Sequence, residues 1–179
     1  ERAALLKALA HVQSVVERRN TIPILSNVLL NAQKGKLTLS ATDMDLAVPE
    51  SVEATASKTG SVTAPAHTMY EIVRKLPDGS QVEIETGANS DLTIRAGRSR
   101  FTLQCLPVSD FPVMNEGDLP HKFQLAASDL KSVVDRTRFA ISTEETRYYL
   151  NGIYFHAAKS NQVDVLRGVA TDGHRLARV

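Results

Sequence analysis

Residues 25–32 read LSNVLLNA, and residues 150–157 read LNGIYFHA. These two stretches lie 125 positions apart and share a run of apolar residues that is typical of a β-strand. A helical pattern precedes each of them at the same distance, because Leu5-Leu6-Lys7 recurs as Leu130-Lys131-Ser132. The period is longer than the roughly 20 to 50 residues of solenoid repeats, so it predicts duplicated domains.

A third match follows in the same order. Residues 41–47 read ATDMDLA, and residues 170–177 read ATDGHRLA, 129 positions further on. The larger distance requires four more residues in the second copy, and we expect them in a longer loop at residues 159–162. Helix, strand and strand therefore occur twice in one order, which a chance likeness of short apolar patterns does not produce.

Helical spacing of apolar residues and period-two alternation predict the remaining elements. Helices are expected over residues 3–16, at 69–76, and from Ser128, as N-cap, to Ile141. Strands are expected at residues 24–32, 37–41, 46–52 and 61–64, as a meander between 82 and 105, and then at 123–125, 148–157 and 163–170. This order predicts an α+β protein with antiparallel sheets.

Residues 107–120 hold three prolines and several acidic residues, and this composition predicts a linker. We expect a complete first domain at residues 1–117 and the opening part of a second at 118–179. The chain begins at Glu1 and ends inside an alternating stretch, so we also expect it to be a piece of a longer protein.

Composition excludes several classes of function. A single cysteine, Cys105, allows no intrachain disulfide and no thiolate zinc site. No apolar run is long enough to cross a bilayer and no signal peptide is recognisable, so we expect a cytoplasmic protein that does not contact membranes. The net charge is +1, but residues 1–40 hold six basic side chains against two acidic ones, while residues 41–56 hold four acids and no base. Surfaces of opposite sign therefore remain compatible with a nucleic-acid partner.

Asp172-Gly173-His174-Arg175 is the first segment to test for catalysis, because an aspartate can orient an imidazole as a general base. An α+β enzyme that uses Asp172 and His174 as a dyad is one hypothesis; a solvent-exposed turn is the other. No nucleophile elbow, phosphate loop or zinc-binding helix motif accompanies the segment. We expect no catalytic residue, no metal and no cofactor.

Two further motifs each allow two interpretations. Arg147-Tyr148-Tyr149 combines a cation with two aromatic rings, which suits phosphate contact and stacking but also ordinary packing. Arg98 and Arg100 alternate beside apolar residues on a predicted strand. They would either keep an exposed edge soluble or form a docking edge for another subunit.

Five motifs in order resemble the bacterial DNA polymerase III beta subunits, the family of sliding clamps. They read TIPILSN at 21–27, GRSRF at 97–101, LPVSDFP at 106–112, RYYLNG at 147–152 and ATDGHRLA at 170–177. The resemblance implies the DNA-clamp fold: three similar domains in each chain, and two chains closed head to tail into a homodimeric ring around duplex DNA. It also implies that this chain lacks the strand before the first helix, the rest of domain two and all of domain three.

The same resemblance implies three sets of site residues and a non-catalytic role as a processivity factor. Double-stranded DNA would be contacted by Arg19, Arg74, Arg147, Tyr148 and Tyr149. At position 67 a relative has arginine where this chain has His67, so we expect no DNA contact from His67. Short peptides of the replicative polymerase, the clamp loader and repair polymerases would enter a cleft lined by Leu150, Thr171, Gly173, His174, Arg175 and Leu176. The subunit contact would be made by Ile72, Phe101 and Leu103, flanked by Arg98 and Arg100.

Three functions are therefore open from the sequence: a sliding clamp, the dyad enzyme, and a peptide-binding module without a DNA role. The resemblance favours the clamp. The third predicts that replacing Arg19, Arg74 and Arg147 leaves DNA affinity and its salt dependence unchanged.

Overall fold

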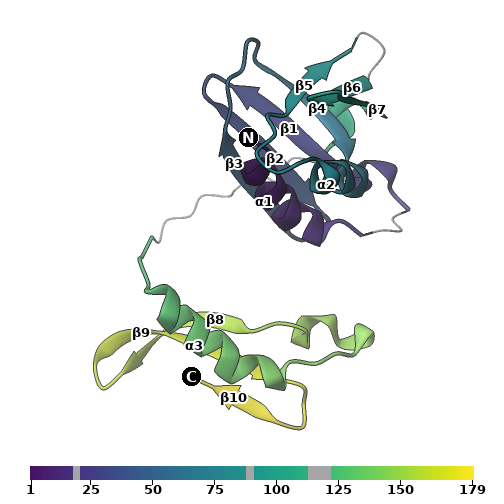
Figure 1. Cartoon of the computed structure of the whole chain (residues 1–179). Coiled ribbons are helices and arrows are strands. Elements are labelled where there is room, and N and C mark those ends of the chain that lie inside the picture. Colours follow the sequence, from purple (N-terminus) through teal and green to yellow (C-terminus); the bar gives the residue numbers. More distant parts are fainter. Residues whose placement is uncertain (18–20, 88–90, 113–121) are drawn as a thin grey trace. The chain divides into compact units, whose positions relative to one another are not determined.

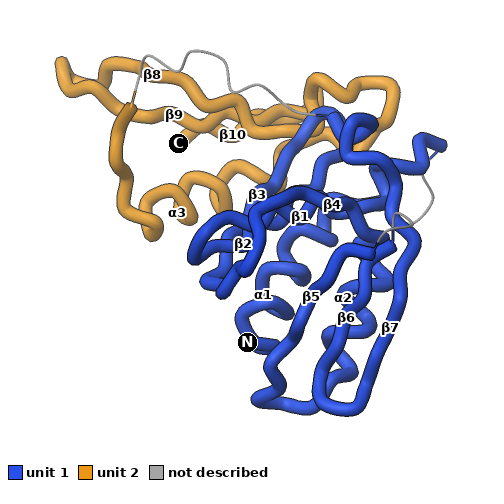
Figure 2. The backbone as a smooth tube through the Cα atoms, turned by 90° about the horizontal axis from the view of Figure 1, so that it is seen from above, with its two compact units in different colours: residues 1–116 blue, residues 117–179 orange. Residues whose placement is uncertain are grey.

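The computed structural model describes residues 1–17, 21–87, 91–112 and 122–179. The chain divides into two compact units, residues 1–116 (unit 1) and residues 117–179 (unit 2), which Figure 2 shows in different colours. Each unit has its own secondary structure and its own buried core. In the described part of the chain, no helix is long and apolar enough to cross a membrane.

In its described residues, unit 1 contains two α-helices and two antiparallel sheets (Figure 1). The helices are α1 (Arg2–Val12), which continues as the 3₁₀ turn η1 (Gln13–Val15), and α2 (Ala66–Lys75). The larger sheet has the order β3-β2-β1-β4, with β1 Asn27–Gln33, β2 Lys36–Thr42, β3 Ala47–Glu53 and β4 Gly60–Pro65. The smaller sheet has the order β5-β6-β7, with β5 Glu83–Thr86, β6 Asp91–Ala96 and β7 Ser99–Gln104.

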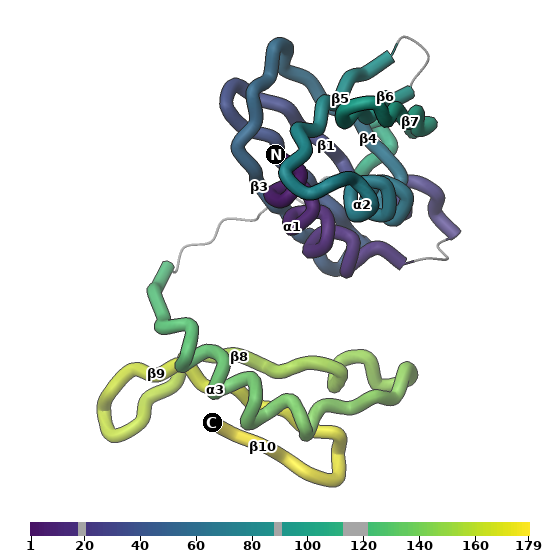
Figure 3. Tube along the Cα trace, in the orientation of Figure 1, coloured from purple at the N-terminus to yellow at the C-terminus, as the bar shows by residue number. Residues whose placement is uncertain are grey.

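The core of unit 1 follows from the helical periodicity of α1. Leu5, Ala8, Leu9 and Val12 recur at the spacing of one helix face and are all buried. Helix α1 packs against both α2 and the larger sheet, as Figures 1 and 3 show. Burying a large aliphatic side chain contributes about 1.5–3 kcal/mol. The main cluster also includes Val28, Leu30, Leu39, Met69, Val73, Leu92, Ile94 and Leu103. Burial raises the pKa of the Cys105 thiol at the margin of this core.

Over residues 122–179, unit 2 contains one α-helix and one three-stranded antiparallel sheet. Helix α3 (Ala127–Thr137) runs into the 3₁₀ turn η4 (Arg138–Ala140), and a second 3₁₀ segment, η5 (Glu145–Leu150), precedes the sheet. The strands are β8 (Tyr154–Ser160), β9 (Val163–Thr171) and β10 (Leu176–Arg178), in the order β10-β9-β8. The buried core is small and centres on Ala140, Ala170 and Ala177.

The predicted duplication is confirmed by the secondary structure and by the strand register. Helices α1 and α3 both have 11 residues, start 125 positions apart and continue into a 3₁₀ turn. The pair Leu29↔Ser40 between β1 and β2 has its counterpart in Tyr154↔Val169 between β8 and β9. The first residues of these two pairs are 125 positions apart and the second residues are 129 apart. The two offsets found in the sequence therefore describe the same pair of strands in both units.

The longer loop expected at residues 159–162 is wrong. Both hairpins have two-residue turns, because Gln33 pairs with Lys36 and Ser160 pairs with Val163. Asn161 and Gln162 form the second turn with φ of 48° and 68°, a conformation that suits tight hairpins. The four extra residues instead lengthen the paired part of the hairpin, by two residues in each strand.

Three other local predictions differ from the structure. Ser128 is not the N-cap of α3, because the helix begins at Ala127 after Ala126. Residues 123–125 form no strand, since no described strand pairs with them, and the Phe123 side chain is exposed. Residues 23–26 and 145–150 are 3₁₀ segments that precede the strands rather than parts of them.

Candidate functional surfaces

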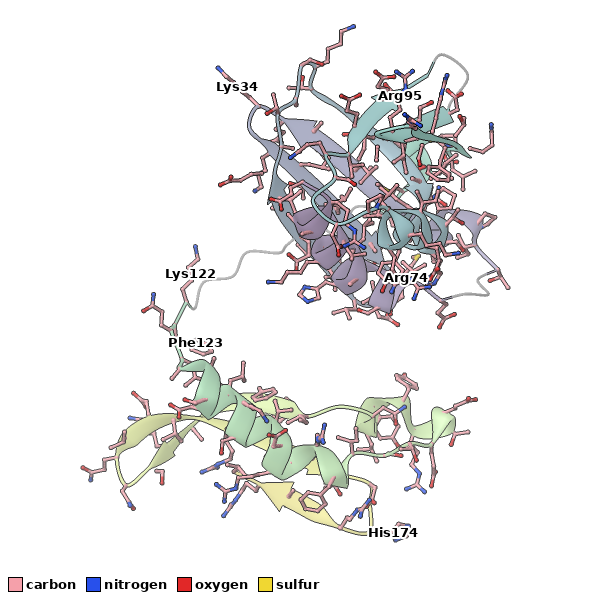
Figure 4. All side chains as sticks on the ribbon, viewed as in Figure 1. Lys34, Arg74, Arg95, Lys122, Phe123 and His174 are labelled. Carbon is pink, nitrogen blue, oxygen red and sulfur yellow. The ribbon has the colours of Figure 1, made fainter. Side chains whose placement is uncertain are left out.

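Residues 171–175 form a tight turn between β9 and β10. Thr171 Oγ1 donates to the carbonyl of Arg175 at 2.7 Å and accepts from the N–H of Gly173 at 3.1 Å. Asp172 Oδ1 accepts from the backbone N–H groups of His174 and Arg175, both at 2.9 Å. Gly173 adopts a φ of 90°, which L residues rarely take. The turn therefore has a defined shape, with His174 at its outer end (Figure 4).

The Asp172 carboxylate is engaged in holding this turn. Its bonds from the backbone N–H groups of Arg175 and His174 lower the pKa of Asp172 to about 2. Its second oxygen accepts from Arg175 Nε at 2.9 Å. Among the residues that the structure describes, no hydrogen bond joins this carboxylate to the His174 imidazole. The geometry of a general-base dyad is absent from this described turn, and the turn interpretation is favoured.

The counterpart turn in unit 1 repeats three of these hydrogen bonds. Met44 N–H donates to Thr42 Oγ1 at 3.0 Å. Asp43 Oδ1 accepts from the N–H groups of Asp45 and Leu46, at 3.0 and 2.7 Å. Met44 has a φ of 85°, close to that of its counterpart Gly173. The repeat therefore extends to the details of a five-residue turn.

Arg147 connects the 3₁₀ segment η5 to the turn of unit 2. Its Nη1 donates to the carbonyl of Asp172 at 3.3 Å. A Cβ on Gly173 would lie 3.1 Å from the same Nη1, so glycine leaves room for this approach. The neighbouring Leu150 is half-buried and Leu176 is exposed. The structure thus brings together two motifs that the sequence analysis treated separately.

Tyr148 and Tyr149 present an aromatic surface in η5. Their rings lie 5.8 Å apart in an edge-to-face arrangement, and their side chains are 78% and 71% exposed. Arg147 beside them pairs with both carboxylate oxygens of Glu144, at 2.8 and 3.1 Å. Two exposed rings next to a guanidinium suit stacking and phosphate contact.

Arg74 has a similar environment on α2. Its Nη2 donates to Glu71 at 2.6 Å, and this bond raises the pKa of the guanidinium. The guanidinium also lies 6.0 Å from the ring centre of Tyr70 (Figure 4 labels Arg74). Exposed ion pairs of this kind contribute little to stability, so both Arg74 and Arg147 can exchange their glutamate for another anion. Arg19, also predicted to contact DNA, lies outside the described residues.

An open hollow of about 260 Å³ lies between α2 and β7, and both Ile72 and Phe101 line it. Strand β7 is the last strand of its sheet, and no other described strand pairs with its outer edge. Arg100 is exposed on β7, while Arg98 lies in the turn before it rather than on the strand. Leu103 is buried in the core of unit 1 and adds little to this surface.

Two family models match this chain, one over each unit. The model for the N-terminal domain of the DNA polymerase III beta subunit matches residues 1–115. The model for its central domain matches residues 124–179. The chain belongs to the DNA polymerase III beta subunit family.

Relatives in this family include the beta sliding clamp of Caulobacter vibrioides, which is 58% identical over 99% of this chain, and that of Pseudomonas aeruginosa, which is 43% identical over 99%. The chain spans about half of their length, 48% and 47%. A crystal structure of the Caulobacter crescentus clamp superposes with a TM-score of 0.95 at 57% identity, covering 99% of this chain and 48% of that one. A Bartonella birtlesii clamp, solved bound to griselimycin, gives 0.93 at 54% identity over 100% of this chain and 48% of that one.

Three contacts near the residues predicted to bind DNA were not predicted from the sequence. Glu71 and Glu144 each lie three positions before an arginine, a helical spacing that signals such pairs. His67 is the third: its Nε2 donates to the carbonyl of Val16 at 2.9 Å, and its Nδ1 lies 3.0 Å from the Gln13 amide oxygen. Nothing in the sequence indicated that His67 joins α2 to η1.

Proposed function

We propose that this chain forms the first domain, residues 1–117, and part of the second domain, residues 118–179, of a DNA sliding clamp. The clamp encircles duplex DNA and keeps the replicative polymerase on its template during DNA replication. The observation that carries the proposal is the duplicated unit, with its strand register repeated at Leu29↔Ser40 and Tyr154↔Val169. Because relatives named beta sliding clamp are about twice as long, further repeats to complete a ring are expected.

The proposed DNA contact uses Arg19, Arg74 and Arg147 with Tyr148 and Tyr149. A clamp must hold the duplex without stopping on any sequence, so it needs phosphate contacts and no base readout. The pairs Glu71–Arg74 and Glu144–Arg147 support this role, since the two arginine side chains are 52% and 36% exposed and can reach a phosphate. Such a protein confines DNA and catalyses no reaction, and it acts where the chromosome is, in the cytoplasm.

The proposed peptide contact uses the turn 171–175 together with Leu150 and Leu176. The exposed Leu176 and half-buried Leu150 offer apolar surface, and the turn adds polar groups around it. We expect peptides of the polymerase, the clamp loader and repair polymerases to dock here. This chain supplies one wall of the cleft, so we expect weak binding unless the rest of the protein is present.

The proposed subunit contact uses Ile72 and Phe101 with Arg98, Arg100 and the edge of β7. The hollow between α2 and β7 would receive an apolar side chain of the partner, and the two arginines would meet acidic residues. Leu103 would support this surface from the core.

Retention on DNA of different topology tests the proposal. The full-length protein, loaded on a nicked circular plasmid, should stay bound through gel filtration and should be lost after the circle is cut. Equal retention on circular and linear DNA would contradict a ring. No DNA binding at all, with peptide binding intact, would favour the peptide module.

A further inference from the structure

We propose that unit 1 contains a second peptide site, built like the proposed cleft of unit 2, and that residues 106–111 of the same chain already fill it. The inference rests on the proposed peptide cleft of unit 2. Its ligand class is a short linear peptide with two apolar anchors, the chemistry of the segment that fills it now.

The repeat identifies the counterpart positions. Ile24, Leu25 and Leu29 of unit 1 correspond to Tyr149, Leu150 and Tyr154 of unit 2, all at a distance of 125 positions. The register supports this, because Leu29 pairs with Ser40 as Tyr154 pairs with Val169. In each unit a turn of the same hydrogen-bond pattern begins two residues after that strand partner, at Thr42 and at Thr171. Position and neighbouring turn are therefore equivalent.

The two sets of positions differ in what covers them. In unit 2, Tyr149 and Tyr154 are 71% and 69% exposed, and Leu150 is half-buried. In unit 1, the counterparts of Tyr149 and Leu150, Ile24 and Leu25, are only 6% and 3% exposed, and Leu29 is half-buried. Phe111, which is itself 7% exposed, forms one buried cluster with them, and Leu106 of the same segment packs against that cluster.

This cluster is separate from the main core of unit 1. It consists of Ile24, Leu25 and Phe111, with Leu29 and Leu106 packed around them. The segment therefore attaches to the domain by apolar anchors at its two ends, Leu106 and Phe111. The 3₁₀ turn η3 (Val108–Asp110) brings those anchors to one surface, and the N–H of Phe111 donates to the carbonyl of Val108 at 3.1 Å.

Backbone hydrogen bonds hold the first anchor as they would hold a bound peptide. The Thr63 hydroxyl donates to the carbonyl of Leu106 at 2.7 Å and accepts from its N–H at 3.0 Å. The Asn27 amide donates to the same hydroxyl at 3.1 Å. Thr63 and Asn27 are both buried. Two backbone bonds and two apolar anchors are the elements of peptide recognition in a groove.

The two units therefore have the same arrangement of turn and apolar positions, but they differ in whether an external peptide can reach these positions. Unit 1 retains the turn and the apolar positions, but its own segment 106–111 occupies them. External peptides are thereby directed to the counterpart surface of unit 2, and the site of unit 1 becomes accessible only when the segment is displaced.

Fluorescence anisotropy with a labelled peptide of residues 104–112, with Cys105 replaced by serine, tests this on the full 1–179 chain. Phe111→Ala should bind the peptide at least tenfold more tightly than the unchanged chain. Leu106→Ala, which removes the other apolar anchor of the segment and leaves the groove intact, should also increase binding. Phe123→Ala serves as the matched control, because it truncates an exposed phenylalanine that belongs to none of the proposed surfaces and should change nothing. A peptide with both anchors replaced by alanine should not bind.

The location of binding separates this inference from the proposed function. Adding Leu25→Ala to the Phe111→Ala chain should abolish the gain, and adding Leu150→Ala should not. Dependence on Leu150 alone would support the cleft of unit 2 and overturn the filled site of unit 1. If Phe111→Ala does not fold, as circular dichroism would show, Leu106→Ala decides: affinity equal to that of the unchanged chain would overturn the proposal.

Discussion

Met44 and Gly173 occupy the same position in two copies of one turn and have nearly the same φ, 85° and 90°. In both copies the residue donates its N–H to the hydroxyl of the threonine two positions earlier. Unit 1 accepts a side chain at this strained position because that side chain points outward and is 54% exposed. In unit 2 the approach of Arg147 favours glycine.

Replacing Gly173 by alanine should destabilise unit 2 by about 1–2 kcal/mol, because an L residue at this φ is strained. The added Cβ also lies close to Arg147, so the contact of Arg147 with Asp172 should weaken. Urea unfolding, followed by a probe in unit 2, measures the change. Gly152→Ala is the control, since its Cβ would meet no atom within 4 Å. Equal effects of the two substitutions would contradict the argument.

Met44→Gly should relieve the corresponding strain in unit 1. The relief is on the order of 1–2 kcal/mol, and the greater freedom of glycine in the unfolded chain offsets about 0.4–1 kcal/mol of it. We expect a net gain between about 0 and about 1.6 kcal/mol in the free energy of unfolding of unit 1. A loss of stability in denaturant titrations would show that the Met44 side chain makes a contribution of its own.

The stability of unit 2 should depend on the ionisation of Asp172. Its pKa in the folded chain is about 2, lowered from 3.8 by the N–H groups that it accepts from. A lowered pKa stabilises the folded state above the unfolded-state pKa, and this contribution is lost as the pH falls from about 4 towards 2. Asp172→Asn should therefore lower the melting temperature near neutral pH and have progressively less effect as the pH approaches 2. A difference in melting temperature that stays constant over this range would exclude the charge as its cause.

Glu144→Gln should increase the affinity of the full-length protein for DNA, because it removes the carboxylate that now pairs with Arg147. Arg147→Ala should decrease the affinity and reduce the slope of log K against log salt by about 1. Lys34→Ala, which removes a cation from the β1–β2 turn, should leave the slope unchanged and serves as the control. If Lys34→Ala and Arg147→Ala have equal effects, general charge rather than a defined contact explains the binding.

Phe101→Asp should weaken association of the full-length protein by at least about tenfold, since it places a charge in the hollow beside Ile72. Sedimentation velocity over a concentration series measures the dimer dissociation constant. Val163→Asp, which changes an exposed apolar residue of unit 2, is the control. A fully dimeric Phe101→Asp protein would exclude the hollow from the subunit contact.

Periodicity predicted the elements whose one face is buried. The spacing of Leu5, Leu9 and Val12 defines α1, and the β5-β6-β7 meander follows from alternation. The same patterns could not distinguish a strand from the 3₁₀ segments at 23–26 and 145–150, because short apolar runs occur in both.

The candidate site was predictable where the chemistry is local, as in the turn at 171–175, whose threonine, aspartate and glycine are turn-forming residues. The packing of Phe111 on Leu25 was not, since the two are far apart in the sequence and Phe111 lies in a segment whose prolines indicate a loop. The pairing of Arg147 with the Asp172 carbonyl was missed for the same reason.

The unequal β-hairpins have a consequence for how such repeats diverge. The paired part of each arm is two residues longer in β8–β9 than in β1–β2, which adds about 7 Å to the ribbon. An even number of added residues leaves every side chain on its original face, whereas a single one would turn the apolar row outward. The addition of residues in pairs therefore lengthens the hairpin of one copy and leaves its buried face unchanged.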